Sequence, residues 1–160
     1  MKNVYKQKRE QGFTIIEVLI VLAIAAVILL IVFLAVPSLQ RSSRNNGIRN
    51  DSANMLAGVN DYITNNNGTL PTGVAGTSPT ISITGTGTAT EAKVRGGTNV
   101  TLTTGGCAPA SPPAQGTVAI YTGCKCNTNA NNNIVSARAI SALFVTETSS
   151  SATATQCIES

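Results

Sequence analysis

The chain has 160 residues and a formal net charge of +4, from 11 basic and 7 acidic side chains. It contains no His, which excludes the catalytic groups and the common zinc sites that depend on imidazole. Its length is enough for one folded domain beyond any membrane segment.

The basic charge is concentrated at the start of the chain. Residues 1–12 carry four basic and one acidic side chain, or +3, which leaves +1 for residues 13–160. Basic residues that flank a membrane span stay on the cytoplasmic side. We therefore expect residues 1–12 to be a cytoplasmic leader, although three arginines after the apolar run argue mildly against this orientation.

A 24-residue apolar run, Phe13 to Val36, follows the leader, with Thr14 and Glu17 as its only polar side chains. As a helix it would be about 36 Å long, against about 30 Å for the hydrocarbon core of a bilayer. It is longer than the core of an ordinary secretory signal peptide, and it leads into Pro37 where such a peptide would end in a small-residue cleavage site. Residues 13–36 are therefore predicted to span the membrane.

Residues 37–64 have the pattern of an amphipathic helix that continues the first one. The apolar stripe recurs at helical spacing and comprises Ile48, Ser52, Met55, Val59, Tyr62 and Ile63. The Asn-rich segment before Gly68, followed by Pro71, predicts the helix end. Pro37 and Asn45-Asn46-Gly47 predict a kink or a frayed turn inside the helix, because proline removes a donor and Asn and Gly form helices poorly.

Residues 65–160 change composition to Thr, Gly, Ser and Asn. Four short β-type runs separated by glycine-rich connectors are Thr80 to Thr84, Asn99 to Thr103, Thr117 to Thr122 and Ala139 to Thr146. We expect an α+β fold, in which a long N-terminal helix packs on a small antiparallel sheet of about four strands. A competing interpretation of residues 72–98 is a partly disordered polar tract, because large apolar residues are few there.

All four cysteines, Cys107, Cys124, Cys126 and Cys157, lie in the C-terminal third. Their even number in a segment placed outside the membrane favours disulfides. On a strand, Cys124 and Cys126 would share a face and each bond elsewhere, so we favour Cys107 with one of them and Cys157 with the other. The spacing does not fit a zinc site, and we expect no metal and no cofactor.

Glu17 is the residue that a simple membrane anchor does not explain, because a carboxylate in a spanning helix costs about 2.5–3.5 kcal/mol. It lies in the segment from Lys6 to Leu22, which reads KQKREQGFTIIEVLIVL. This order of basic residues, Gly, Phe, Thr, two apolar residues, Glu and an aliphatic run resembles the class III leader of type IV prepilins and pseudopilins.

The resemblance implies specific roles for three residues. A prepilin peptidase would cut between Gly12 and Phe13, and the new N-terminus of Phe13 would be N-methylated. Glu17 would then meet the Phe13 amine of a neighbouring subunit when the helices pack into a filament. The alternative is a pair within one chain, because the Phe13 amine and the Glu17 carboxylate of the same helix are about one helical turn apart.

The resulting prediction is a structural subunit, a major pilin, of an extracellular type IV pilus. The sequence does not choose among adhesion, motility, DNA uptake and electron transport as the role of the filament. The subunit would begin as a single-pass precursor in the cytoplasmic membrane and be polymerised into a helical homo-oligomer by a pilus assembly machinery. A minor pilin, a type II secretion pseudopilin and a membrane-anchored adhesin are the alternatives. An enzyme is disfavoured because neither a convergent acid pair nor a phosphate-binding loop accompanies the lack of His.

DNA binding, known for some relatives, has little support in the sequence. The cations that could form a patch on the head are Lys93, Arg95, Lys125 and Arg138. They are scattered and accompanied by acidic residues, so solvated surface is the better interpretation.

Overall fold

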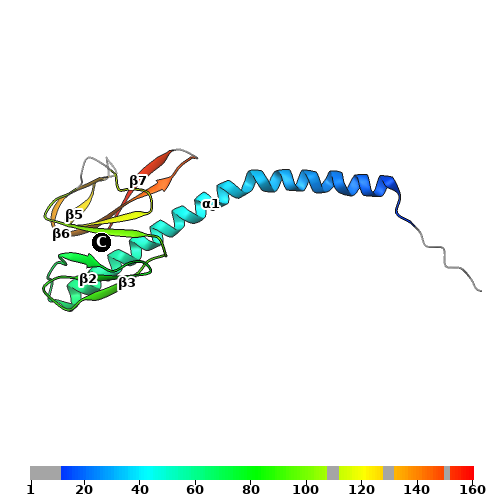
Figure 1. Ribbon diagram of the computed structural model, residues 1–160. Coiled ribbons are helices and arrows are strands. Elements are labelled where there is room, and N and C mark those ends of the chain that lie inside the picture. The colour runs from blue at the N-terminus through cyan, green and yellow to red at the C-terminus, as the bar shows by residue number, and fades with distance from the viewer. Residues whose placement is uncertain (1–11, 108–111, 128–131, 150–151) are drawn as a thin grey trace, which may run out of the picture. The chain divides into compact units, whose positions relative to one another are not determined.

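The computed structural model describes residues 12–107, 112–127, 132–149 and 152–160 (Figure 1). The predicted basic leader therefore lies outside the described residues, except for Gly12. The chain divides into two compact units, residues 1–40 and residues 41–160. The second unit is called the head below.

One helix, α1 (Ile15–Asn65), supplies all the regular structure described in the first unit. Nearly every side chain of this helix up to Gln40 is exposed, on all of its faces. Its most apolar 18-residue window has a mean hydropathy of 3.5 and no part of it is buried. A helix that is apolar all round needs lipid or other helices around it. Within the described residues, α1 is the only helix long and apolar enough to cross a membrane.

The helix continues through both places where a disruption was expected. Pro37 and Asn45 to Gly47 are all helical, so the frayed turn predicted at residues 45–47 is wrong. Contacts with the head outweigh the poor helix propensity there: the Asn45 amide donates to the Glu147 carbonyl at 2.8 Å, and Gly47 is buried. A kink at Pro37 stays a prediction.

The amphipathic stripe predicted for the second half of α1 is confirmed. Ile48, Met55, Val59 and Tyr62 are buried in the head, and Ile63 packs partly buried against the same core.

The predicted helix end is confirmed as well. The Gly68 N–H donates to the Ile63 carbonyl at 2.8 Å, and Asn67 and Gly68 take the left-handed φ values of 53° and 83° that end many helices.

A three-stranded antiparallel sheet covers one part of this stripe. It consists of β1 (Gly73–Ala75), β2 (Thr80–Thr84) and β3 (Thr90–Lys93), in the order β1-β2-β3. Ile81 and Ile83 of β2 point into the core and alternate with half-buried neighbours.

A side chain at Gly58 of α1 would collide with Ile83 and Ala92, so glycine lets the helix approach this sheet closely. Residues 72–98 are therefore folded, and the competing interpretation of a disordered tract is wrong.

The second sheet has four strands, in the order β4-β5-β6-β7. Their bounds are β4 (Asn99–Thr104), β5 (Thr117–Asn127), β6 (Asn132–Glu147) and β7 (Thr153–Glu159). The β4 and β5 strands pair in parallel, with Asn99 opposite Thr117, and the other pairs are antiparallel. Parallel neighbours need a crossover of about a dozen residues or more, and residues 105–116 supply it.

The expected single antiparallel sheet is thus corrected to two sheets, one of them mixed. Both contribute to one core with α1, through Ile81 and Ile83 from the first sheet and Val118, Ile120, Ile140 and Phe144 from the second. Figure 1 shows β2 and β3 on one side of this part of α1 and β5 and β6 on the other. Helix burial by two sheets explains why so few large apolar residues suffice for the head.

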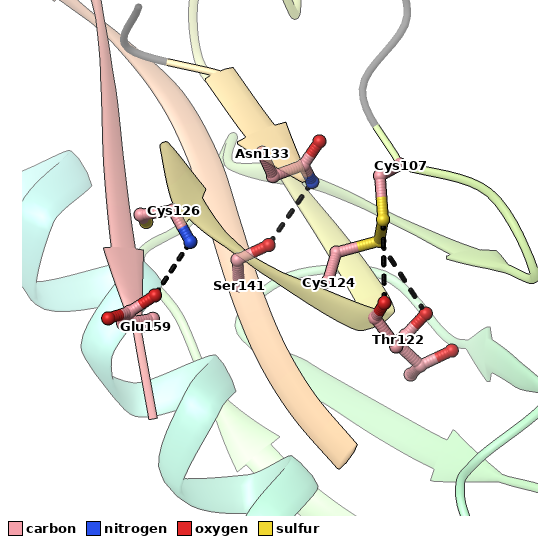
Figure 2. Close-up of a disulfide and its surroundings, with 8 residues drawn as sticks. Cys107, Thr122, Cys124, Cys126, Asn133, Ser141 and Glu159 are labelled. Carbon is pink, nitrogen blue, oxygen red and sulfur yellow. Dashed lines mark hydrogen bonds between the residues drawn. A yellow bond between two sulfur atoms is a disulfide. The ribbon is translucent and has the colours of Figure 1, made fainter. Parts of the chain in front are cut away.

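A bulge interrupts the pairing of β5 and β6 near the cysteines. Thr122 lies opposite Ile140, but Cys124 lies opposite Val135, so the β6 residues 136–139 face only Gly123. Gly123 has a φ of 79°, which glycine adopts without strain. The Asn133 amide donates to the Ser141 hydroxyl at 3.1 Å across the bulge (Figure 2).

Candidate functional site

The predicted cleavage site lies just before the first turn of α1. Gly12, Phe13 and Thr14 are non-helical and exposed, and α1 begins at Ile15. Phe13 is 90% exposed, and a Cβ at Gly12 would meet no atom within 4 Å. The Gly12–Phe13 peptide bond is therefore open to an enzyme, as exposed non-helical segments generally are.

Glu17 forms a reciprocal capping box with Thr14. The Thr14 N–H and its hydroxyl both donate to Glu17 Oε2 at 2.8 Å. The Glu17 N–H donates in return to Thr14 Oγ1 at 3.4 Å. Such a box satisfies free N–H groups in the first turn of a helix. The first turn of α1 is therefore stabilised by its own side chains.

Sequence reasoning missed this role of Glu17, which it considered only as a partner of the Phe13 amine. The signal was present, because Thr three residues before Glu at the start of an apolar run is the usual capping-box pattern. Both residues follow the Gly12–Phe13 bond, so cleavage would leave the box intact.

The surroundings of Glu17 are apolar. Glu17, Phe13, Val18 and Val21 line one hollow on the surface of α1. The described residues 12–40 contain no basic side chain, and neither ion pair found in the described parts of the chain includes Glu17. If lipid or another helix covered this hollow, the carboxylate would need a positive partner from outside these residues.

In the head, Asp51 fastens α1 to the connection between the two sheets. Its carboxylate is 2% exposed and accepts hydrogen bonds from Arg95 N at 3.0 Å and Arg95 Nε at 3.1 Å. The Thr98 hydroxyl donates to it at 2.7 Å. A buried carboxylate is tolerated when it is paired and hydrogen-bonded in this way. A side chain at Gly47 would overlap the Arg95 guanidinium, so the missing Cβ makes room for this pair.

A second ion pair fastens α1 to the end of β6. Arg44 Nε and Nη2 donate to the two Glu147 carboxylate oxygens at 2.8 and 2.7 Å, the two-pronged geometry that suits guanidinium and carboxylate. The Arg44 hydrogen bonds hold the pKa of Glu147 below its usual value, and the charge of Arg41 lowers it further. The pKa of Arg44 is raised by the same bonds.

All four cysteines form disulfides, Cys107–Cys124 and Cys126–Cys157, with Cα–Cα distances of 5.6 and 5.7 Å. This matches the favoured pattern in which Cys124 and Cys126 take separate partners. It also removes the thiolates that a four-cysteine metal site would need. The Cys126 N–H donates to the Glu159 carboxylate at 2.6 Å, so β7 is fixed to β5 by a second contact (Figure 2).

The other predicted site residues do not come together. Lys93 ends β3 and Arg95 follows it, whereas Lys125 lies on β5 and Arg138 in the β6 bulge, so the four cations are divided between the two sheets. In the part of the chain that the structure describes, no group of three or more His, Cys, Asp or Glu residues is placed to hold a metal.

A comparison with protein families identifies the N-terminal segment. Residues 7–33 match the model of the prokaryotic N-terminal methylation motif, which is the class III signal peptide of type IV pilins. The match covers Gly12, Phe13, Thr14 and Glu17 and confirms the resemblance. Neither a curated protein nor a solved structure matches the chain.

The motif and the fold agree with each other. A long N-terminal apolar helix that continues into a two-sheet α+β head is a type IV pilin-like architecture. More particularly, the motif supports a type IV pilin-like prepilin or pseudopilin.

Proposed function

We propose that this chain is the major pilin of an extracellular type IV pilus. Residues 13–36 anchor the precursor in the cytoplasmic membrane with residues 1–12 in the cytoplasm. A prepilin peptidase cuts between Gly12 and Phe13, Phe13 is N-methylated, and the assembly machinery packs the mature chains through α1. The observation that carries the proposal is the methylation motif at the start of an exposed apolar helix.

The exposed apolar surface supports assembly through α1. Val18 to Leu34 contains only Ile, Leu, Val, Ala and Phe side chains, and such a surface is stable in lipid before assembly and among neighbouring helices afterwards. The head has its own core, two disulfides and two ion pairs among its described residues. It therefore does not need the apolar half of α1 to fold, which leaves that half available to other subunits.

Glu17 can serve assembly without losing its cap. Both Thr14 donors bond to Oε2, so Oε1, which accepts no hydrogen bond within the described residues, can accept from the Phe13 amine of a neighbouring subunit. Two opposite charges brought together in an apolar environment attract strongly, which offsets much of the cost of removing them from water. The pair would form in one register only and would align each new helix.

N-terminal sequencing of protein sheared from the cell surface tests the proposal. The sequence should begin with Phe13, and its mass should include one added methyl group. An N-terminus at Met1 in extracellular filaments would contradict it. The abundance of the chain in the sheared fraction distinguishes the alternatives, because a minor pilin or a pseudopilin would be processed in the same way but would not be the main component.

A further inference from the structure

The net positive charge of the head comes from residues on or against the start of its helical segment. Residues 41–160 contain seven basic and five acidic side chains, or +2. Four arginines lie on or against residues 41–51 of α1, together with two carboxylates, which gives four minus two, or +2; they are Arg41, Arg44, Arg49 and Arg95, with Asp51 and Glu147. The remaining three basic and three acidic residues cancel. This set of four arginines is called the arginine surface below.

A groove lies within the arginine surface. It has a volume of about 550 Å³ and is lined by the two arginines, by the Glu147 carboxylate that pairs with Arg44, and by polar, apolar and glycine residues; the lining comprises Arg44, Asn45, Ile48, Arg95, Gly96, Gly97, Thr98, Gln115, Gly116, Val145 and Glu147. The side chains of Arg44 and Arg95 are 55% and 48% exposed although each is paired with a carboxylate. Arg44 uses Nε and Nη2 for Glu147, and Arg95 uses Nε for Asp51. Within the part of the chain that the structure describes, Arg44 Nη1 and both Nη atoms of Arg95 thus remain as donors for an anion.

Arg41, the first of these arginines, follows shortly after the predicted membrane span in the sequence. Arg41 follows Val36 by five residues, which is at most about 18 Å of extended chain and about 7.5 Å of helix. The headgroup layer of a bilayer extends about 5–8 Å beyond the hydrocarbon core. Arginines on the outer side of a span run against the positive-inside preference, so their concentration there requires a separate explanation.

We propose that the groove between Arg44 and Arg95, with Arg41 beside it, binds the phosphate of an anionic phospholipid in the outer leaflet. The inference rests on the proposed membrane-anchored precursor. Guanidinium groups suit phosphate because they present several donors in one plane. The lipid is bound before assembly and is left behind when the subunit enters the filament.

Lipid binding by the uncleaved full-length precursor in mild detergent tests the proposal. Native mass spectrometry would compare phosphatidylglycerol with phosphatidylcholine. The wild type should retain phosphatidylglycerol preferentially, and Arg44→Gln and Arg95→Gln should each weaken its binding about fivefold. Arg138→Gln, which removes the same charge from the β6 bulge, is the matched control and should change nothing.

A third variant, Arg41→Gln, separates a loss of lipid binding from a loss of folding. Within the described residues Arg41 forms neither an ion pair nor a hydrogen bond that the substitution would break. This variant should weaken phosphatidylglycerol binding while the thermal unfolding of the head is unchanged. Equal binding of the two lipids, or an equal loss in Arg138→Gln, would overturn the proposal. Displacement by inorganic phosphate at lipid concentrations would overturn it too, since the site would then take free phosphate. None of these results affects cleavage at Gly12, which is measured separately.

Discussion

Glu17 combines two interactions that different substitutions can separate. It caps α1 through Thr14, and in the proposed filament its charge meets the amine of a neighbouring chain. Glutamine is also accepted at this position of a capping box, so Glu17→Gln removes the charge and keeps the cap. Thr14→Val does the reverse, because it removes the hydroxyl and keeps the carboxylate.

We expect Glu17→Gln to leave membrane insertion and cleavage after Gly12 intact. The yield of sheared filaments should fall at least about tenfold, which corresponds to a loss of about 1.4 kcal/mol per subunit contact. Immunoblots of the membrane and sheared fractions measure both. Thr14→Val should cost only about 1 kcal/mol in the first turn and assemble far better. Normal filament yield in Glu17→Gln would show that the cap is the main role of this residue.

Asp51 is the buried charge on which the head depends most. Asp51→Ala removes the acceptor of three hydrogen bonds and leaves the Arg95 amide and the Thr98 hydroxyl without their partner. We expect the free energy of unfolding to fall by about 3 kcal/mol, as measured by urea denaturation. The control is Asp61→Ala on the exposed side of the same helix, which should change stability by less than about 0.5 kcal/mol. Equal effects would contradict the importance of the buried site.

At the scale of elements, α1 is fastened to the four-stranded sheet by the Arg44–Glu147 pair, and this contact depends on pH. The pKa of Glu147 in the folded protein lies below the ordinary value of 4.5, so folding favours the charged carboxylate. The stability that the charged Glu147 carboxylate contributes to the fold is complete above pH 4.5. It is lost as the pH falls through the lower pKa that Glu147 has in the folded protein. The unfolding temperature of the wild type should therefore exceed that of Glu147→Gln at neutral pH, and the two should converge in acid. If the difference in unfolding temperature between the two proteins stayed constant down to pH 2, the Arg44–Glu147 ion pair would not be its cause.

The C-terminal strand depends on a disulfide. Cys126 and Cys157 are separated by 31 residues, and closing a loop of this length stabilises a fold by about 3–4 kcal/mol in the chain-entropy model. The double variant Cys126→Ser, Cys157→Ser should lose stability of this order, and hydrogen exchange should increase first in β7. Unchanged exchange in β7 would show that its backbone pairing with β6 is sufficient.

The division into two units has a consequence for the whole molecule. The head has a core of its own, drawn from α1 and both sheets, and a compact unit of this kind can fold alone. A chain that begins at Arg41 should therefore be monomeric, contain both disulfides and unfold cooperatively, but it should not enter filaments. Size-exclusion chromatography and circular dichroism measure the first properties, and complementation of a strain that lacks the gene measures the last. Aggregation of the shortened chain would show that the head needs residues 13–40.

Local patterns of the sequence determined the N-terminal methylation motif, the apolar run, the buried stripe of α1 and its end at Asn67-Gly68. Each depends on residues within a few positions of one another, through helical spacing, capping and length. The arrangement of the strands was decided by the tertiary structure alone. Both sheets share a core with α1, and β4 pairs with β5 in parallel, through contacts between segments that are distant in the sequence. The Arg44–Glu147 pair joins residues 103 positions apart. The partners of Cys124 and Cys126 lie in the connection after β4 and on β7, and only the fold brings these segments to the end of β5. Non-local contacts of this kind have no periodic signature, so only the folded chain defines them.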